Sequence, residues 1–381
     1  MSTVVESGYW QALRAKVTNL GGACNFHAHI DRAHTFSSKY LAHYGMQPQD
    51  APRVPLQVKQ SLTGEIHRGP AYTPEDLEAR MRATLDNTIA LGVTHLVTFI
   101  DSTPDIGLVA IEVALKLVDE YRDRLQLEIV PHPIFGFKND RRFDRSRWEL
   151  FEEACTHSHG VGALPERDIR SDSIGPIEHL RRTILLGKKL KKPVYVHVGQ
   201  ANDPTQRDIF DLIDAVKWLD YQAGEYETPV VWAVHNISAS CFSEEDFARV
   251  VEGMRDYRIG LICCPRAALS MRQFRVLNAP IHNSVARVLE FACAGVDVRL
   301  GTDNISDIFI PPSTECMLDQ AMVLADMLRF YHLGVLAKFV TGERLNDNDK
   351  AAIVDYLKSD RDAFHRRDPD FRHSLEILGL M

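Results

Sequence analysis

The sequence predicts an α/β protein that folds as a (β/α)8 TIM barrel. Short apolar runs alternate with longer amphipathic stretches, and eight such runs occur along the 381 residues. Runs such as VYVHV and VVWAV are apolar on both faces, which is typical of parallel strands covered on both sides. No glycine-rich phosphate loop follows the first run, which favours a closed barrel over an open doubly wound sheet. The expected strands span residues 23–28, 94–100, 126–132, 159–164, 193–197, 229–234, 259–263 and 296–301.

Helix start and stop signals lie between the expected strands. Thr73, followed by Pro74 and two acidic residues, predicts the start of a helix ahead of strand 94–100. Gly92 predicts the end of that helix. Ser243, followed by three acidic residues, predicts a helix start of the same kind between the sixth and seventh strands.

We expect a single domain over residues 1–381, because no repeat, linker or low-complexity tract divides the chain. Residues 33–73 form a long insertion after the first strand, rich in Gln, Pro, Tyr and His. A loop of this length on a compact domain is usually functional, so we expect a lid. Residues 335–381 are expected to form a helical C-terminal extension.

Composition and charge narrow the classes of partner. The net charge is -8 and no basic face or tail stands out, which argues against nucleic-acid binding. No stretch approaches the roughly 20 apolar residues of a membrane span. Seven cysteines without a CxxC pair, and an N-terminus unlike a signal peptide, predict reduced thiols and a cytoplasmic location. We therefore expect a small-molecule substrate, and apolar helical faces beyond residue 313 could pair in a homo-oligomer.

Polar residues that suit a metal ion follow four of the expected strands. His27 and His29 lie two positions apart on the first strand, so their side chains project from the same face. His197 ends the fifth strand, His235 follows the sixth and Asp303 follows the eighth. The carboxyl ends of barrel strands form one rim, where active sites of this fold lie. Imidazole and carboxylate ligands suit one divalent ion, either Zn²⁺ or Fe²⁺.

These motifs resemble the amidohydrolase superfamily, and within it the cytosine deaminase and adenosine deaminase type of site. The resemblance rests on HAHID after strand one, HVGQ after strand five, VHN after strand six and GTDN after strand eight, and covers roughly residues 20–335. Members of this superfamily often carry a small β-sandwich beside the barrel. Only 22 residues precede the first expected strand here, so we expect little or no such module.

The resemblance implies a role for each matching residue. His27, His29, His197 and Asp303 would hold the metal, and Asp303 would also take a proton from the attacking water. His235 would hydrogen-bond that water and the tetrahedral adduct. Two-metal members of the superfamily carry a bridging Lys or Glu at strand four. No Lys stands there and Glu166 lies close by; we favour one metal.

Two departures from the family pattern concern the substrate. Ring deaminases of the family have a Glu three residues after the strand-five His, which protonates a ring nitrogen, and this chain has Gln200. An amide donates hydrogen bonds but has no acidic proton to relay. His132 stands where cytosine deaminases place a Gln that reads the pyrimidine, which argues against cytosine as the substrate. The remaining candidates for contact with substrate, or for supplying the missing proton, are Glu65, His67, Asp101, Glu166 and Arg167.

Three functions remain open at this point. Hydrolytic deamination of a small nitrogen heterocycle is marginally favoured by the motifs. Hydrolysis of a cyclic or substituted amide, with ring opening, fits Gln200 better because it does not need a ring-protonating acid. A lyase or decarboxylase on the same fold is the third, because a fold alone does not fix a function.

Overall fold

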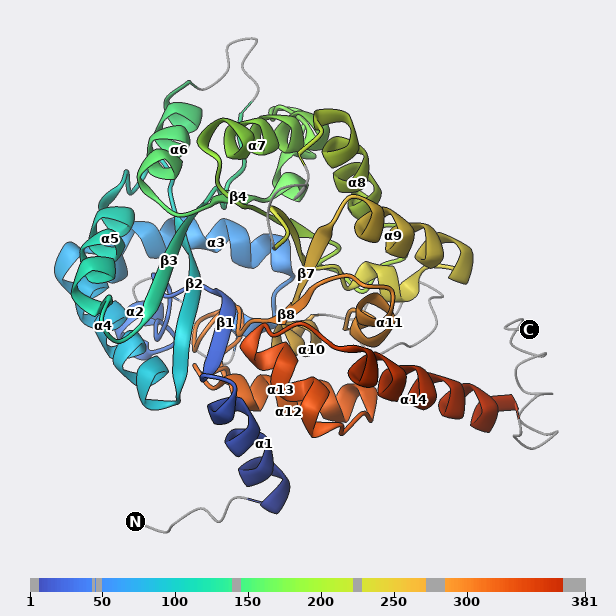
Figure 1. Cartoon of the computed structure of the whole chain (residues 1–381). Coiled ribbons are helices and arrows are strands. Elements are labelled where there is room, and N and C mark those ends of the chain that lie inside the picture. The colour runs from blue at the N-terminus through green and yellow to red at the C-terminus, as the bar shows by residue number, and fades with distance from the viewer. Residues whose placement is uncertain are drawn as a thin grey trace.

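Eight parallel strands alternate with helices in the computed structural model (Figure 1), which describes residues 7–42, 45, 50–138, 145–221, 228–271 and 285–365. The strands follow one another in chain order through a three-stranded and a five-stranded sheet. This arrangement confirms the predicted (β/α)8 class, and no strand outside these eight occurs in the ranges just given. The strands are β1 Ala23–Ala28, β2 Val93–Asp101, β3 Gln126–His132, β4 Val161–Ala163, β5 Val194–Val198, β6 Val231–His235, β7 Ile259–Cys263 and β8 Val298–Leu300.

The two sheets meet at two seams. At one seam the His159 amide, just before β4, donates to the Ile129 carbonyl of β3 at 2.8 Å. At the other seam the Asp303 amide, just after β8, donates to the His27 carbonyl of β1 at 2.8 Å. The first and last strands therefore lie side by side, although they are far apart in the sequence.

Helices surround the strands (Figure 1), and the strands are largely buried because they pack between the barrel interior and these helices. None of the helices in the described part of the chain is long and apolar enough to cross a membrane. The helices are α1 Gly8–Asn19, α2 Ser38–Leu41, α3 Leu56–Arg68, α4 Pro74–Ala90, α5 Val109–Tyr121, α6 Arg145–His157, α7 Pro176–Leu190, α8 Asp208–Leu219, α9 Glu244–Asp256, α10 Pro265–Ser270, α11 Val288–Cys293, α12 Met317–Leu328, α13 Leu333–Thr341 and α14 Asp347–His365.

The predicted helix caps are confirmed. The Thr73 hydroxyl accepts a hydrogen bond from the Asp76 amide at 3.3 Å, and α4 begins at the next residue. Gly92 lies just beyond α4 with a φ of 81°, a left-handed conformation that suits glycine. The Ser243 hydroxyl caps α9 in the same way as Thr73, accepting from the Asp246 amide at 3.2 Å.

The insertion at residues 33–73 differs from the loop that the sequence predicted. It contains α2 and the 13-residue helix α3, whose inner face is buried against the barrel. The hydrophobic pattern did not predict α3, because polar side chains, including Lys59 and Gln60, occupy part of its buried face. Residues 43–44 and 46–49 of the insertion, and residues 366–381 of the expected C-terminal extension, lie outside the described residues, and the rest of that extension is helical in α13 and α14.

The seam between β1 and β8 is tightly packed. The Asn25 side chain crosses it twice, donating to the Thr302 hydroxyl at 2.8 Å and accepting from the Thr302 amide at 3.1 Å. Gly301 lies so close to β1 that a Cβ atom there would be 2.6 Å from the His27 Cβ and 2.8 Å from the His27 carbonyl oxygen. Because backbone atoms cannot move aside easily, this position requires glycine.

The first prediction concerns this close approach. Gly301→Ala should lower the free energy of unfolding by about 1–3 kcal/mol, because the new methyl group overpacks the seam. Gly8→Ala is the matched control, since nothing lies within 4 Å of a Cβ there, and it should shift that free energy by less than about 1 kcal/mol. Urea unfolding measures both, and equal stability of Gly301→Ala and the wild type would show that the seam is looser than described.

Candidate metal centre

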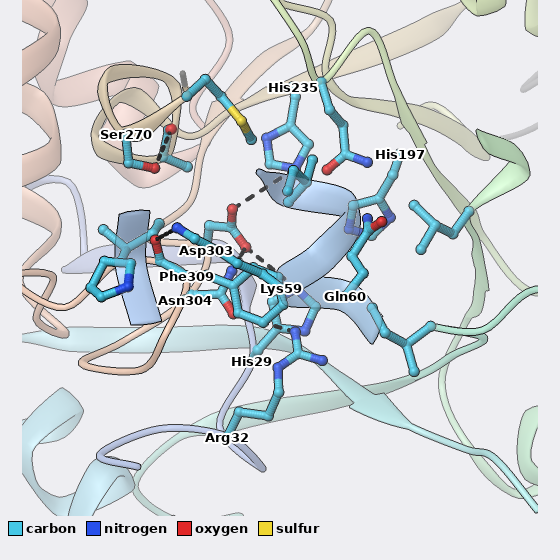
Figure 2. Close-up of a pocket in the computed structure, with 18 of the residues that line it drawn as sticks. His29, Arg32, Lys59, Gln60, His197, His235, Ser270, Asp303, Asn304 and Phe309 are labelled. Carbon is cyan, nitrogen blue, oxygen red and sulfur yellow. Dashed lines mark hydrogen bonds and ion pairs between the residues drawn. The ribbon is translucent and has the colours of Figure 1, made fainter. Parts of the chain in front are cut away.

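Five predicted residues meet at the carboxyl end of the barrel, and Figure 2 labels His29, His197, His235 and Asp303. The Asp303 Oδ1 atom lies 3.3 Å from His29 Nε2 and 3.5 Å from His27 Nε2, and its Oδ2 atom lies 3.9 Å from His235 Nε2. His27, His29 and His197 offer ligand atoms within 4.8 Å of one another, and so do His27, His235 and Asp303. The structure therefore brings together the whole predicted ligand set, with His235 beside it.

The histidine nitrogens of this group are buried without hydrogen-bond partners. Both ring nitrogens of His27 and His235 lack one among the described residues, as does Nε2 of His197. Nδ1 of His197 lies 3.2 Å from the Ala163 carbonyl oxygen, so it carries the proton and leaves the Nε2 lone pair free. Buried unpaired nitrogens are costly unless a ligand satisfies them. The donor set thus fits a divalent cation.

The protonation states also suit a cation. Burial lowers the pKa of His29 and His197 well below the usual histidine value, and lowers the pKa of His235 to about 4. Burial alone would raise the pKa of Asp303, but the neighbouring side chains of His27 and His29 outweigh it and hold that pKa well below its usual range. Neutral imidazoles and an ionised carboxylate are the forms that bind metal.

Two of these residues have left-handed backbone conformations. The φ angle is 73° at His235 and 61° at Asp303. Such conformations cost of order 1–3 kcal/mol outside glycine and persist only where the surrounding structure holds them. The hydrogen bond from the Asp303 amide to the His27 carbonyl holds the conformation of Asp303. The hydrogen bond from the Asn236 amide to the Val198 carbonyl, at 2.9 Å, holds that of the preceding residue, His235. The barrel thus aims both side chains inward.

A chain of hydrogen bonds orients the Asp303 carboxylate. The side-chain Nδ2 of Asn304 donates to Asp303 Oδ1 at 2.9 Å, and the side-chain Oδ1 of Asn304 accepts from Arg32 Nη2 at 3.3 Å. Arg32 is itself held by an ion pair of 2.6 Å with Asp101. Buried partners of this kind fix the orientation of a metal ligand. Asp101 therefore supports the site from beneath and does not line its cavity.

His132 is a further histidine beside the group. Its Nδ1 lies 2.9 Å from Asp101 Oδ1, and its Nε2 has no partner among the described residues. Its ring centroid lies 4.9 Å from that of His197 and 5.1 Å from that of His29. Because the Asp101 carboxylate accepts the Nδ1 proton, Nε2 presents a lone pair to the cavity. His132 is therefore placed to accept a hydrogen bond from a ligand.

The candidate ligands His29, His197 and Asp303, together with His235, line a cavity of about 440 Å³. Predicted residues that line it are His29, His132, His197, Gln200, His235 and Asp303. Sequence reasoning missed Lys59 and Gln60, which reach the cavity from α3, and the position of the insertion after the first strand was the only signal of them.

Besides Asp101, three other predicted substrate residues do not line this cavity. Glu65 is exposed on the outer side of α3 and pairs with Arg68. His67 is buried between Asp101 and Asp105, with nitrogen–oxygen distances of 3.1 and 2.9 Å.

Arg167 is the third of these residues. It lies behind the cavity wall and donates to the side-chain oxygen Oε1 of Gln60 at 2.9 Å. Glu166 accepts from the side-chain amides of Gln60 and Gln206 at 2.9 and 3.3 Å. Neither residue lines the cavity, so both support its wall. We therefore leave Glu65, His67 and Arg167 out of the substrate contacts.

Comparison with known proteins agrees with this fold. No family model matches the chain. An uncharacterized protein of Haemophilus influenzae is 27% identical over 273 residues, which cover 72% of this chain and 91% of that protein.

Among solved structures, 5-methylcytosine deaminase from Klebsiella pneumoniae, liganded with phosphonocytosine, has a TM-score of 0.72 at 20% identity over 87% of this chain and 75% of that one. N-isopropylammelide isopropylaminohydrolase from Burkholderia multivorans has a TM-score of 0.62 at 19% identity over 88% and 75%. Adenine deaminase from Arthrobacter aurescens has a TM-score of 0.54 at 14% identity over 88% and 99%. These neighbours are TIM-barrel amidohydrolases, and this chain has their fold.

The second prediction tests the metal-binding group. The wild type should contain about one divalent ion per chain, and His197→Ala should weaken metal affinity by more than about 100-fold, since outer-shell changes alone typically cost 10–100-fold. His132→Ala is the matched control and should keep the ion. Elemental analysis after dialysis measures the content, and full occupancy in His197→Ala would remove His197 from the ligand set.

Proposed function

We propose that this protein is a hydrolase that uses one divalent ion, Zn²⁺ or Fe²⁺, to release ammonia from a small nitrogen heterocycle. His27, His29, His197 and Asp303 would hold the ion. The observation that carries the proposal is the convergence of three imidazoles, with unpaired ring nitrogens, and one carboxylate beside a cavity of about 440 Å³. A cavity of this size suits a small ligand.

The chemistry divides between the ion and the side chains. When bound, a divalent cation acts as a Lewis acid and makes water nucleophilic at neutral pH. Asp303, kept ionised by its surroundings, accepts the proton of the attacking water and returns it to the leaving nitrogen. His235 lies 3.9 Å from Asp303 and faces the cavity, where it would hydrogen-bond the oxygen of the tetrahedral adduct.

The structural neighbours support a heterocyclic substrate. Their names describe enzymes that act on 5-methylcytosine, adenine and N-isopropylammelide. In this chain His132 and Gln200 would meet such a ring, because His132 Nε2 and Gln200 Nε2 are both buried and unpaired among the described residues. One side chain accepts a hydrogen bond and the other donates one, so together they would orient a ring with both kinds of polar atom.

Ring opening of a cyclic amide is the second candidate function. Gln200 favours it, because the amide can hold a carbonyl oxygen but cannot protonate a ring nitrogen. The same Asp303 would then protonate the amide nitrogen as the ring opens. Detection of a ring-opened carboxylate in place of ammonia would decide for this alternative.

We also infer that the protein works in the cytoplasm. All seven cysteines are free thiols, and three of the buried ones, Cys155, Cys263 and Cys264, have pKa values raised by burial. Unreactive thiols without disulfides are typical of a reducing compartment.

The third prediction tests the role of Asp303. Asp303→Asn should lower kcat for ammonia release by about 10²–10⁴-fold or more, because the amide cannot accept the proton of the attacking water. Asp319→Asn, at an acid that pairs with Arg266 away from the cavity, is the matched control and should keep kcat. A folded Asp303→Asn protein with near-native kcat would contradict the mechanism.

The fourth prediction tests the amide at the position of the family acid. Gln200→Glu should raise kcat/KM for aminopyrimidine deamination by about 10-fold or more, because it restores a proton donor beside the ring. An ammonia-release assay at pH 7 measures the change. An unchanged kcat/KM, with metal content intact, would show that Gln200 does not approach the reacting atoms.

A further inference from the structure

Lys59 on α3 is a buried cation in the wall of the cavity. Its side chain is 6% exposed, and its Nζ donates to the Phe309 carbonyl oxygen at 3.0 Å. Figure 2 shows Lys59 among the residues that line the cavity, with its bond to Phe309. No carboxylate oxygen of the described residues lies within 4.0 Å of Nζ. The ammonium group therefore has one neutral acceptor and no ion-pair partner.

The charges that line the cavity are unbalanced. Among the described residues, three cations, Arg32, Arg53 and Lys59, line it together with one carboxylate, Asp303. Arg32 is neutralised from behind by its ion pair with Asp101. Arg53 has a largely exposed side chain at the mouth, 3.8 Å from the Asp50 carboxylate. Lys59 is left as the inward-facing positive charge, and a bound divalent cation would add to it.

Asp307 is the nearest acidic group that acts on Lys59. Its Oδ1 accepts the amide hydrogens of Phe309 and Ile310, at 2.8 and 3.1 Å, and its Oδ2 is 4.0 Å from Arg32 Nε. Burial raises the pKa of Asp307 to about 7, so this carboxyl group is only partly ionised at neutral pH. Burial also lowers the pKa of Lys59, against the opposing effect of Asp307. A buried ammonium group without a full counter-charge is unfavourable in the absence of an anion.

The position of Lys59 is fixed from two sides. The bond to the Phe309 carbonyl ties α3 to the segment that follows β8. The neighbouring Gln60 ties α3 to the segment that follows β4, donating to Glu166 and accepting from Arg167, each at 2.9 Å. The ammonium group is thus held in place before a ligand enters, as a preorganised binding group is.

We propose that the substrate carries a carboxylate, which Lys59 binds while the reacting carbon faces Asp303 and His235. The binding of a carboxylate rests on the Lys59 site alone, whereas the position of the reacting carbon rests on the proposed function. A carboxylate matches one ammonium donor, whereas a phosphate dianion is usually met by several donors or by arginine forks. A single-ring heterocycle with one carboxylate is the class of substrate that this cavity would take.

A purely structural role for Lys59 gives a different expectation. If Lys59 only ties α3 to the Phe309 carbonyl, its loss should weaken charged and uncharged ligands alike and lower the melting temperature. If Lys59 binds a carboxylate, its loss should weaken charged ligands selectively. A matched pair of ligands therefore separates the two roles.

The experiment is calorimetric titration of the metal-loaded protein with orotate and with uracil, which share one ring and differ by the carboxylate. The wild type should bind orotate at least about tenfold more tightly than uracil, the effect of one charge-assisted contact. Lys59→Met should bring this ratio close to one, with metal content unchanged. Lys39→Met removes an exposed charge of the same insertion, one that pairs with Asp76, and should keep the wild-type ratio.

Three outcomes would overturn the proposal: equal binding of orotate and uracil by the wild type, an unchanged ratio in Lys59→Met, or equal weakening of both ligands in that variant. Lys59→Gln serves as a second variant if Lys59→Met does not fold. The preference of the wild type for orotate over uracil can be tested without any variant. Because the titration does not depend on turnover, absence of ammonia release would count against the proposed function and leave the binding result standing.

Discussion

The contact of the Asp303 carboxylate with His27 of β1, and with His29 just after this strand, is the interaction on which the site depends. It exists because β8 approaches β1 so closely that Gly301 has no room for a side chain. At the same seam, the hydrogen bond from the Asp303 amide to the His27 carbonyl holds Asp303 in a left-handed conformation. Closing the strands into a barrel and bringing together the candidate ligands are therefore one structural event. A change that opens the seam would disturb both.

The charges around this contact favour a bound cation. Burial keeps the imidazoles of His29, His197 and His235 neutral, and hydrogen bonds keep Asp303 ionised. Arg32 and Asn304 orient the carboxylate from outside. The barrel thus supplies the residues of the hydrolytic site that we propose, while α3 of the insertion supplies Lys59, which would select the ligand.

The convergence of the candidate metal ligands could be predicted from the sequence, because simple geometry governs their positions. Residues two apart on a strand share a face, and strand ends of a parallel barrel share a rim, so His27, His29, His197 and Asp303 had to lie near one another. Contacts with a substrate were harder to predict, because they depend on which face of α3 is turned toward the cavity. Glu65 follows Lys59 by six positions, about 240° around a helix, and so points away from the cavity while Lys59 points inward. The sequence alone did not reveal that a helix forms there, since its buried face carries lysine and glutamine.

Anomalous diffraction from crystals of the metal-loaded protein tests the central claim most directly. The account predicts one peak in the barrel, about 2.0–2.2 Å from a nitrogen of His27, His29 and His197 and from an Asp303 oxygen. A peak coordinated by other residues, or a fully active protein without a peak at this position, would contradict it.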